Sequence, residues 1–207
     1  MPKPIKPYLT KLERRAAKKM TQAQINRRHN LGHSAKTMAG WVVGVAALWF
    51  VGAWLVTSFS PKGPDLSVAV PILGREHITP GTVYKEYNSN PPSSGPHYPQ
   101  DAPTGFYTSA LPDEQLVHNL EHGQIWISYQ PDLPAPALAG LQKLTGDFVI
   151  ITPRSQNDTD IALTAWGRQD KFNLGPDGLD TQRVSDFILR YQNLGPERLN
   201  TPGTHSN

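Results

Sequence analysis

One long apolar stretch dominates the hydrophobic pattern of the chain. No charged residue occurs between residues 37 and 61, and residues 41–59 are almost wholly apolar. About 20 such residues in an α-helix are enough to cross the hydrocarbon layer of a bilayer. Gly40 and Gly44 match the small-xxx-small spacing of helix dimers, but glycine is common in membrane helices, so no oligomeric state is predicted. The pattern therefore predicts a single transmembrane helix over residues 37–61.

The chain beyond this stretch alternates between helical and strand-like periods. Val184, Phe187 and Tyr191 recur at helical spacing, whereas Ile125 and Ile127 alternate with polar or aromatic neighbours as in a strand. The order of elements indicates an α+β domain with a small, mostly antiparallel sheet and flanking helices, preceded by one N-terminal transmembrane helix. We predict helices over residues 111–122, 135–144 and 180–194, and strands over residues 124–129, 148–152 and 161–166.

Residues 88–105 contain five prolines together with several glycines, serines and asparagines. Proline blocks both regular helix and interior strand, so this segment is predicted to be a long, semi-rigid loop. Loops of this length inside compact domains are usually functional or disordered. The aromatic residues near it favour a packed loop.

The charges of the chain are divided unevenly about the apolar stretch. Residues 1–40 hold ten of the 20 Lys and Arg but one of the 17 acidic residues, so the remainder is mildly acidic. Positive charge marks the cytoplasmic side of a span, so the N-terminal tail is predicted inside and the main domain outside the cytoplasm. An acidic domain argues against nucleic-acid binding. A cleaved signal peptide is the rival interpretation, although its charged region would be unusually long.

These patterns together give the predicted organisation and membrane contacts. The basic tail could lie as a helix on anionic lipid, or it could be a solvated run of charge that only sets the topology. The protein is predicted to be a single-pass protein of the cell membrane. The predicted parts are a basic cytoplasmic tail (1–36), the transmembrane helix (37–61), a linker (62–72), an extracytoplasmic α+β domain (73–198) and a disordered C-terminus (199–207).

The sulfur content limits the chemistry of the outer domain. The chain has no cysteine, which excludes disulfides, thiolate metal sites and cysteine nucleophiles. All three methionines, Met1, Met20 and Met38, precede or border the span. A Cu(I) site with thioether ligands is therefore excluded from the domain, whereas zinc, Cu(II), nickel, manganese or iron could bind to nitrogen and oxygen ligands.

Four histidines gather in one half of the outer domain. His118 and His122 belong to an H-x-x-E-H string that also contains Glu121, and on a helix residues four apart share one face. This spacing occurs in zinc peptidases of the inverted type, although so short a motif also arises by chance on solvated helices. His97 lies in the proline-rich loop, whose rigid backbone could hold a third imidazole. Three imidazoles and a water would make an open tetrahedral site.

Longer strings around these histidines are similar to a known family. The strings resemble the family called domain of unknown function 3105, with the resemblance extending over about residues 70–198. The family is mostly bacterial, and the resemblance implies a membrane-anchored protein of unassigned activity. It also implies that the proline-rich loop and the histidine helix belong to one module. The strings are Asn90–Tyr98, Gly105–Tyr107, Leu116–Gly123, Ala165–Gly167 and Pro196-Glu197.

The leading hypothesis from the sequence is a domain that binds a divalent metal, zinc or Cu(II), through His97, His118 and His122. His77 would be a fourth ligand or would support the ligands, and Glu121 would be a hydrogen-bond acceptor or a base. One alternative is a non-catalytic cell-envelope module that binds a protein partner, with structural histidines. Another is a metal-dependent hydrolase, in which Glu121 would be the catalytic candidate.

Overall fold

The structure is a computed structural model that describes residues 10–58 and 60–197. The chain divides after Ser58 into two compact units, which we describe separately. The predicted disordered C-terminus, residues 199–207, lies outside the described residues.

The first unit contains one helix, α1 (Lys11–Ser58), of 48 residues. Its start is a capping box, because the backbone N–H of Thr10 donates to Glu13 and the N–H of Glu13 donates to the Thr10 hydroxyl. The part from Gly40 to Ser58 is apolar and long enough to cross a membrane, and its side chains are not buried within the protein. The helix therefore contains most of the predicted span and continues upstream through much of the basic tail.

The second unit is built on one six-stranded mixed sheet. The strand order is β1-β6-β5-β3-β4-β2. The strands are β1 (Val68–Ala69), β2 (Gly105–Phe106), β3 (Ile125–Tyr129), β4 (Val149–Pro153), β5 (Ile161–Ala165) and β6 (Arg168–Phe172). The helices of this unit are α2 (Asp113–Glu121), α3 (Ala135–Gln142) and α4 (Thr181–Tyr191).

The prediction of a mostly antiparallel sheet is wrong. β4 pairs in parallel with both β2 and β3, while β3–β5, β5–β6 and β1–β6 are antiparallel. The cause is the connection between β3 and β4. It passes through α3, and such a crossover returns the chain to the end at which it started, so the next strand runs in the same direction.

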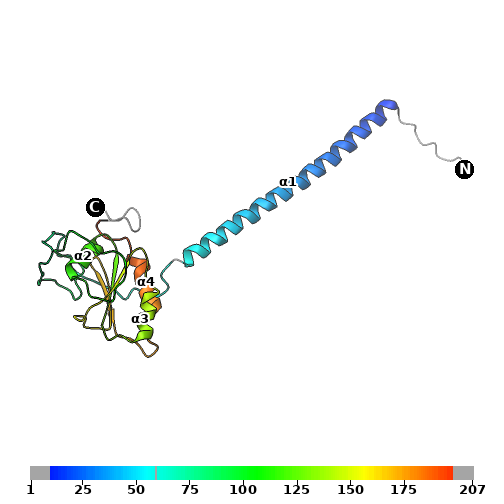
Figure 1. Ribbon diagram of the computed structural model, residues 1–207. Helices are drawn as coiled ribbons and strands as arrows, with labels where there is room; N and C mark the ends of the chain where they lie inside the picture. Colours follow the sequence, from blue (N-terminus) through cyan, green and yellow to red (C-terminus); the bar gives the residue numbers. More distant parts are fainter. Residues whose placement is uncertain (1–9, 59, 198–207) are drawn as a thin grey trace. The chain divides into compact units, whose positions relative to one another are not determined.

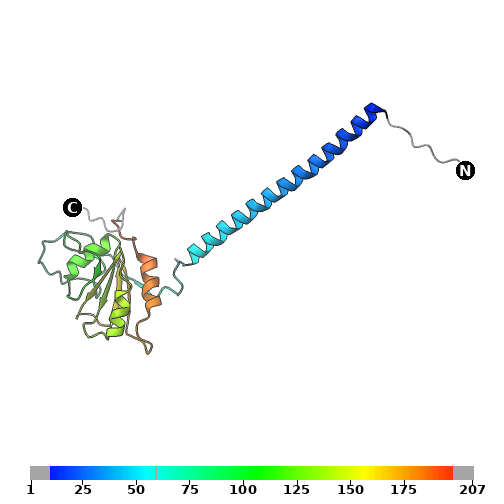
Figure 2. The same cartoon turned by 45° about the vertical axis from the view of Figure 1, so that its right-hand side comes forward.

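The two faces of the sheet carry different helices (Figures 1 and 2). In β3, Ile125 and Ile127 face a core that also contains residues of α3 and α4. Trp126 faces the opposite side, where it packs with Leu116 and Leu120 of α2. This alternation follows from the two-residue period of a strand, and it confirms the two faces that the sequence predicts for this segment.

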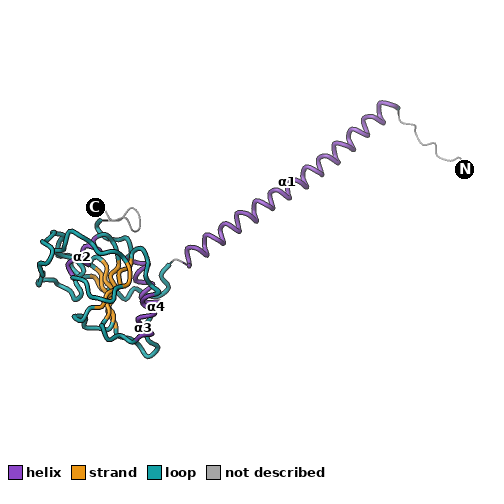
Figure 3. Tube along the Cα trace, in the orientation of Figure 1, coloured by secondary structure: helices purple, strands orange, loops and turns teal. Residues whose placement is uncertain are grey.

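Loops surround α2 on its side of the sheet (Figure 3). The proline-rich loop is packed against the protein, since residues 91–95 are buried and Ser93 and Ser94 are fully covered. The side chain of Gln169 in β6 donates a hydrogen bond of 2.6 Å to the carbonyl of Pro91. The loop is therefore part of the scaffold that positions its neighbours.

The segment that opens the second unit is attached to α4. The backbone N–H groups of Lys62 and Gly63 donate to the carboxylate of Asp186 at 2.9 and 2.6 Å. Farther along, the hydroxyls of Ser67 and Tyr191 are 2.7 Å apart. The predicted linker, residues 62–72, thus contacts α4 and contributes the short edge strand β1.

Candidate metal centre

Three separate parts of the chain bring the candidate site together. Helix α2 supplies His118 and Glu121, and the proline-rich loop supplies His97. His77 arrives through a short parallel bridge with His97, in which Ile78 donates its N–H to the His97 carbonyl and the His97 N–H donates to the carbonyl of Glu76. The bridge places the two imidazoles side by side.

His77, His97, His118 and Glu121 form a compact group. One potential ligand atom from each residue lies within 4.8 Å of the others. The ring centroids of His77 and His97 are 5.0 Å apart, those of His97 and His118 are 5.1 Å apart, and those of His77 and His118 are 5.4 Å apart. His77 is exposed and the other three are buried, so the group opens to solvent on the side of His77. We call these four residues the His/Glu cluster.

The tautomer of His97 is fixed by its backbone neighbour. Its Nδ1 lies 2.8 Å from the carbonyl oxygen of Gly95, which can only accept, so Nδ1 carries the proton. In the neutral ring, Nε2 then presents a lone pair. This atom lies 2.9 Å from Oε2 of Glu121, yet the two make no hydrogen bond. A ring nitrogen and a carboxylate oxygen thus lie close together, both buried, without the alignment of a hydrogen bond.

The surroundings of His118 keep its ring neutral. Burial and, to a smaller extent, the neighbouring imidazoles of His122 and His97 together lower the pKa of His118 to about 4. Within the described part of the chain, Nδ1 of His118 is buried without a hydrogen-bond partner, as is Nδ1 of His122. A neutral imidazole with a free nitrogen is the form that binds metal ions.

His122 lies next to the cluster but outside it. Its ring centroid is 4.6 Å from that of His118, and its Nε2 is 3.8 Å from a carboxylate oxygen of Glu197. Nη1 of Arg75 lies 3.5 Å from Glu121 and 3.7 Å from Glu197. Arg75 and Glu197 thus form a charged border around the end of α2.

The cluster requires a small contraction to bind a metal ion. Zinc binds imidazole nitrogen and carboxylate oxygen at about 2.0–2.2 Å, so tetrahedral ligand atoms lie roughly 3.3 Å apart. The widest separation in the cluster, 4.8 Å, would have to shorten by about 1.5 Å. His77 is the exposed member of the cluster, so its side chain has the most room to move. Three nitrogen donors and one oxygen donor suit zinc or Cu(II).

The sequence of this module matches a family model. The model described as "Protein of unknown function (DUF3105)" matches residues 77–203. The chain belongs to this family. The DUF3105 match begins at His77 and includes the whole cluster, whereas no curated protein and no solved structure matches the chain.

Two residues that the sequence analysis did not single out connect the parts of the DUF3105 site. Asn119 of α2 is fully buried, and its amide accepts from the N–H of Ala102 and donates to the carbonyl of the same residue. Arg154 donates hydrogen bonds to two separate segments: its Nε and Nη2 donate to the carboxylate of Asp113 at the start of α2, and its Nη1 donates to Asn90 of the proline-rich loop. Both residues fix the loop relative to the helix.

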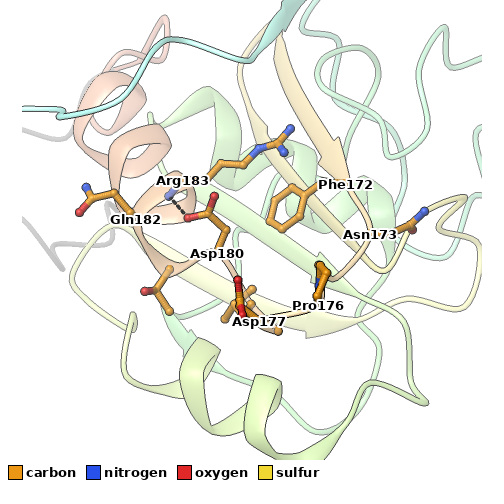
Figure 4. Close-up of a pocket in the computed structure, with 11 residues that line it drawn as sticks. Phe172, Asn173, Pro176, Asp177, Asp180, Gln182 and Arg183 are labelled. Carbon is orange, nitrogen blue, oxygen red and sulfur yellow. Dashed lines mark hydrogen bonds between the residues drawn. The ribbon is translucent and has the colours of Figure 1, made fainter.

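A separate hollow of about 450 Å³ lies between the loop after β6 and the start of α4 (Figure 4). The carboxylate of Asp180 accepts a 2.9 Å hydrogen bond from the N–H of Arg183, which caps α4. The guanidinium of Arg183 bonds to Asp170 at 2.6 and 2.8 Å. Because these charged groups already bond to one another, they are less available to bind a ligand than the unpartnered imidazole nitrogens of the His/Glu cluster.

Proposed function

We propose that this chain is a membrane-anchored protein whose extracytoplasmic domain binds one divalent metal ion, zinc or Cu(II), through His77, His97, His118 and Glu121. The proposal keeps three of the residues predicted from the sequence as ligands or supports, and it gives Glu121 the role of a ligand. His122 is then a neighbour of the site.

The contact between His97 and Glu121 carries the proposal. The side chains are 0% and 2% exposed, and Nε2 of His97 and Oε2 of Glu121 are 2.9 Å apart. A carboxylate facing an imidazole lone pair away from water is unfavourable unless a cation lies near both. A divalent metal ion would bind both atoms and would also use the free nitrogen of His118. Protonation of His97 is the competing explanation, which metal analysis distinguishes.

The alternatives from the sequence gain less support. A partner-binding role for the proline-rich loop is limited to its exposed residues, such as 99, 100 and 103, because residues 91–95 are buried. A hydrolytic role requires Glu121 as a base beside a metal-bound water, whereas its carboxylate already belongs to the ligand group.

Elemental analysis of the full chain tests the proposal. The protein is purified without a His tag in a maltoside detergent, incubated with zinc or Cu(II), desalted and analysed for metal. We expect one metal ion per parent chain, and loss of that ion in His118→Ala and in the nearly isosteric Glu121→Gln.

His122→Ala is the matched control, because His122 lies on the same helix end and is also buried. We expect this variant to retain the metal. Urea unfolding of each variant separates loss of a ligand from loss of the fold. A parent chain that takes up neither metal would refute the proposal, and loss of metal in a folded His122→Ala would restore the ligand set predicted from the sequence.

A further inference from the structure

The open side of the His/Glu cluster carries a positive side chain. Arg75 precedes His77 by two residues, a spacing that places side chains on the same side of extended backbone. Both side chains reach α2, since the His77 ring stacks on that of His118 and Arg75 lies 3.5 Å from Glu121. The exposed edge of the cluster is therefore bordered by the guanidinium of Arg75.

The guanidinium of Arg75 has hydrogen-bonding capacity to spare. Its side chain is 51% exposed, and its nearest carboxylate oxygens are 3.5 and 3.7 Å away. Within residues 10–58 and 60–197, these two contacts are ion pairs and no hydrogen bond of Arg75 is found. A guanidinium carries five N–H donors in a planar fork that matches the geometry of carboxylate and phosphate groups.

A bound metal ion would remove the negative charge of the site. With neutral imidazoles, the carboxylates of Asp101, Glu121 and Glu197 and the guanidinium of Arg75 leave two negative charges in excess, which repel anions. A divalent cation would cancel this excess and add a positive centre next to Arg75. The metal would also have a coordination position toward solvent, because zinc can expand to five ligands and Cu(II) favours tetragonal sites.

We propose that the metal-loaded site binds a small free oxyanion, of the phosphate or carboxylate class, between the metal ion and the guanidinium of Arg75. The proposal rests on the proposed function, since the anion needs the metal. One oxygen of the anion binds the metal on the His77 side, and the others accept hydrogen bonds from Arg75. Metal-free protein has no affinity for the anion.

Cobalt(II) provides a visible probe for the test, because its absorption bands change with the number and type of its ligands. The full chain in maltoside detergent, which contains no phosphate, is loaded with cobalt(II) and titrated with inorganic phosphate. We expect a saturable spectral change in the parent chain. In Arg75→Gln we expect bound cobalt but a phosphate affinity lower by about tenfold or more, since hydrogen bonds to charged groups are worth 1.5–3 kcal/mol.

Lys143→Gln is the matched control, because it removes one positive charge at an exposed position at the end of α3. It should bind cobalt and phosphate like the parent. Equal phosphate responses in Arg75→Gln and the parent would overturn the proposal, and so would cobalt bands that phosphate leaves unchanged. Absence of any cobalt band would overturn the metal site itself, so the two failures are distinguishable.

Glycerol 3-phosphate separates a free anion from a lipid headgroup. It carries the glycerol phosphate unit of a phospholipid, with the phosphate as a monoester, as in phosphatidic acid. Binding of glycerol 3-phosphate without binding of inorganic phosphate would overturn the free oxyanion in favour of an esterified one.

Discussion

Gly195 lies where the chain leaves α4 and crosses the end of α2, and it leaves no room for a side chain. A Cβ added to Gly195 would lie 2.1 Å from the carbonyl oxygen of Glu121 and 2.3 Å from the nitrogen of Gly123. Both are backbone atoms, which cannot rotate away. Two hydrogen bonds hold the crossing, from Asn193 N–H to the Gly123 carbonyl at 2.6 Å and from Glu197 N–H to the Glu121 carbonyl at 3.0 Å.

Gly195→Ala should therefore separate the two segments. An ordinary contact needs about 3.4 Å, so the segments must move apart by more than 1 Å or distort. Loss of two backbone hydrogen bonds costs about 2 kcal/mol in total, and overpacking adds roughly 1–3 kcal/mol. We expect the free energy of unfolding to fall by about 3–5 kcal/mol. The end of α2 should move as well, which lowers metal affinity through Glu121.

Urea unfolding of the full chain, followed by tryptophan fluorescence, measures this loss through the buried Trp126. With a slope of about 2 kcal/mol per molar urea, the midpoint should drop by about 1.5–2.5 M. Gly146→Ala is the matched control, because an added Cβ there meets nothing within 4 Å. It should change stability by less than about 1 kcal/mol. Equal midpoints for the two alanine variants would refute the reasoning.

Two further substitutions test the contacts that hold the domain together. Arg154→Ala leaves Asp113 and Asn90 without their shared donor, so it should cost about 2–4 kcal/mol in urea unfolding, and Arg154→Lys should restore less than half because an ammonium cannot form the paired bonds. A full rescue by lysine would contradict the role of the paired bonds. The hydrogen bond from the N–H of Lys62 is the largest cause that lowers the pKa of Asp186. The ionised carboxylate therefore stabilises the fold at pH values above the ordinary pKa of aspartate, about 3.9. This stabilisation is lost as the pH falls below that value and through the lowered pKa of the folded state. Melting temperatures of the parent and Asp186→Asn should therefore differ most near pH 7 and converge toward pH 3; a difference that stays constant with pH would exclude this linkage.

The helices and strands with strong apolar periods were predictable from the sequence. The helix predicted over residues 180–194 corresponds to α4, because Val184 and Phe187 at helical spacing are both buried. The strand predicted over residues 124–129 corresponds to β3, whose alternating residues face two different cores. Periodicity reports structure in both cases because the two faces of the element meet different surroundings.

Strand β6 was not predicted, because its sequence from Arg168 to Phe172 is mostly polar and charged. The structure shows how these groups are tolerated in a sheet. Asp170 is buried against the guanidinium of Arg183, and Lys171 pairs with Asp158 at 2.8 Å. Each partner is distant in sequence, so no local pattern identifies the compensation. The available signal was the glycine at 167, whose φ of +67° suits the second position of the two-residue turn between β5 and β6.

The sequence identified the face of α2 that carries the candidate site, but it did not determine which residues of that face belong to the cluster. Residues advance about 100° per position on an α-helix, so relative to His118 the side chain of Glu121 lies roughly 60° to one side and that of His122 roughly 40° to the other. Spacing alone therefore slightly favours His122 over Glu121 as the partner of His118. Which of the two residues joins the His/Glu cluster depends instead on the position of His97. The hydrogen bonds around residues 76–78 and 95 place His97 beside Glu121. Since α2 ends at Glu121, His122 follows the turning backbone toward Glu197. A His/Glu cluster that joins a helix to two loops is therefore defined by long-range backbone pairing, which a motif on the helix cannot contain.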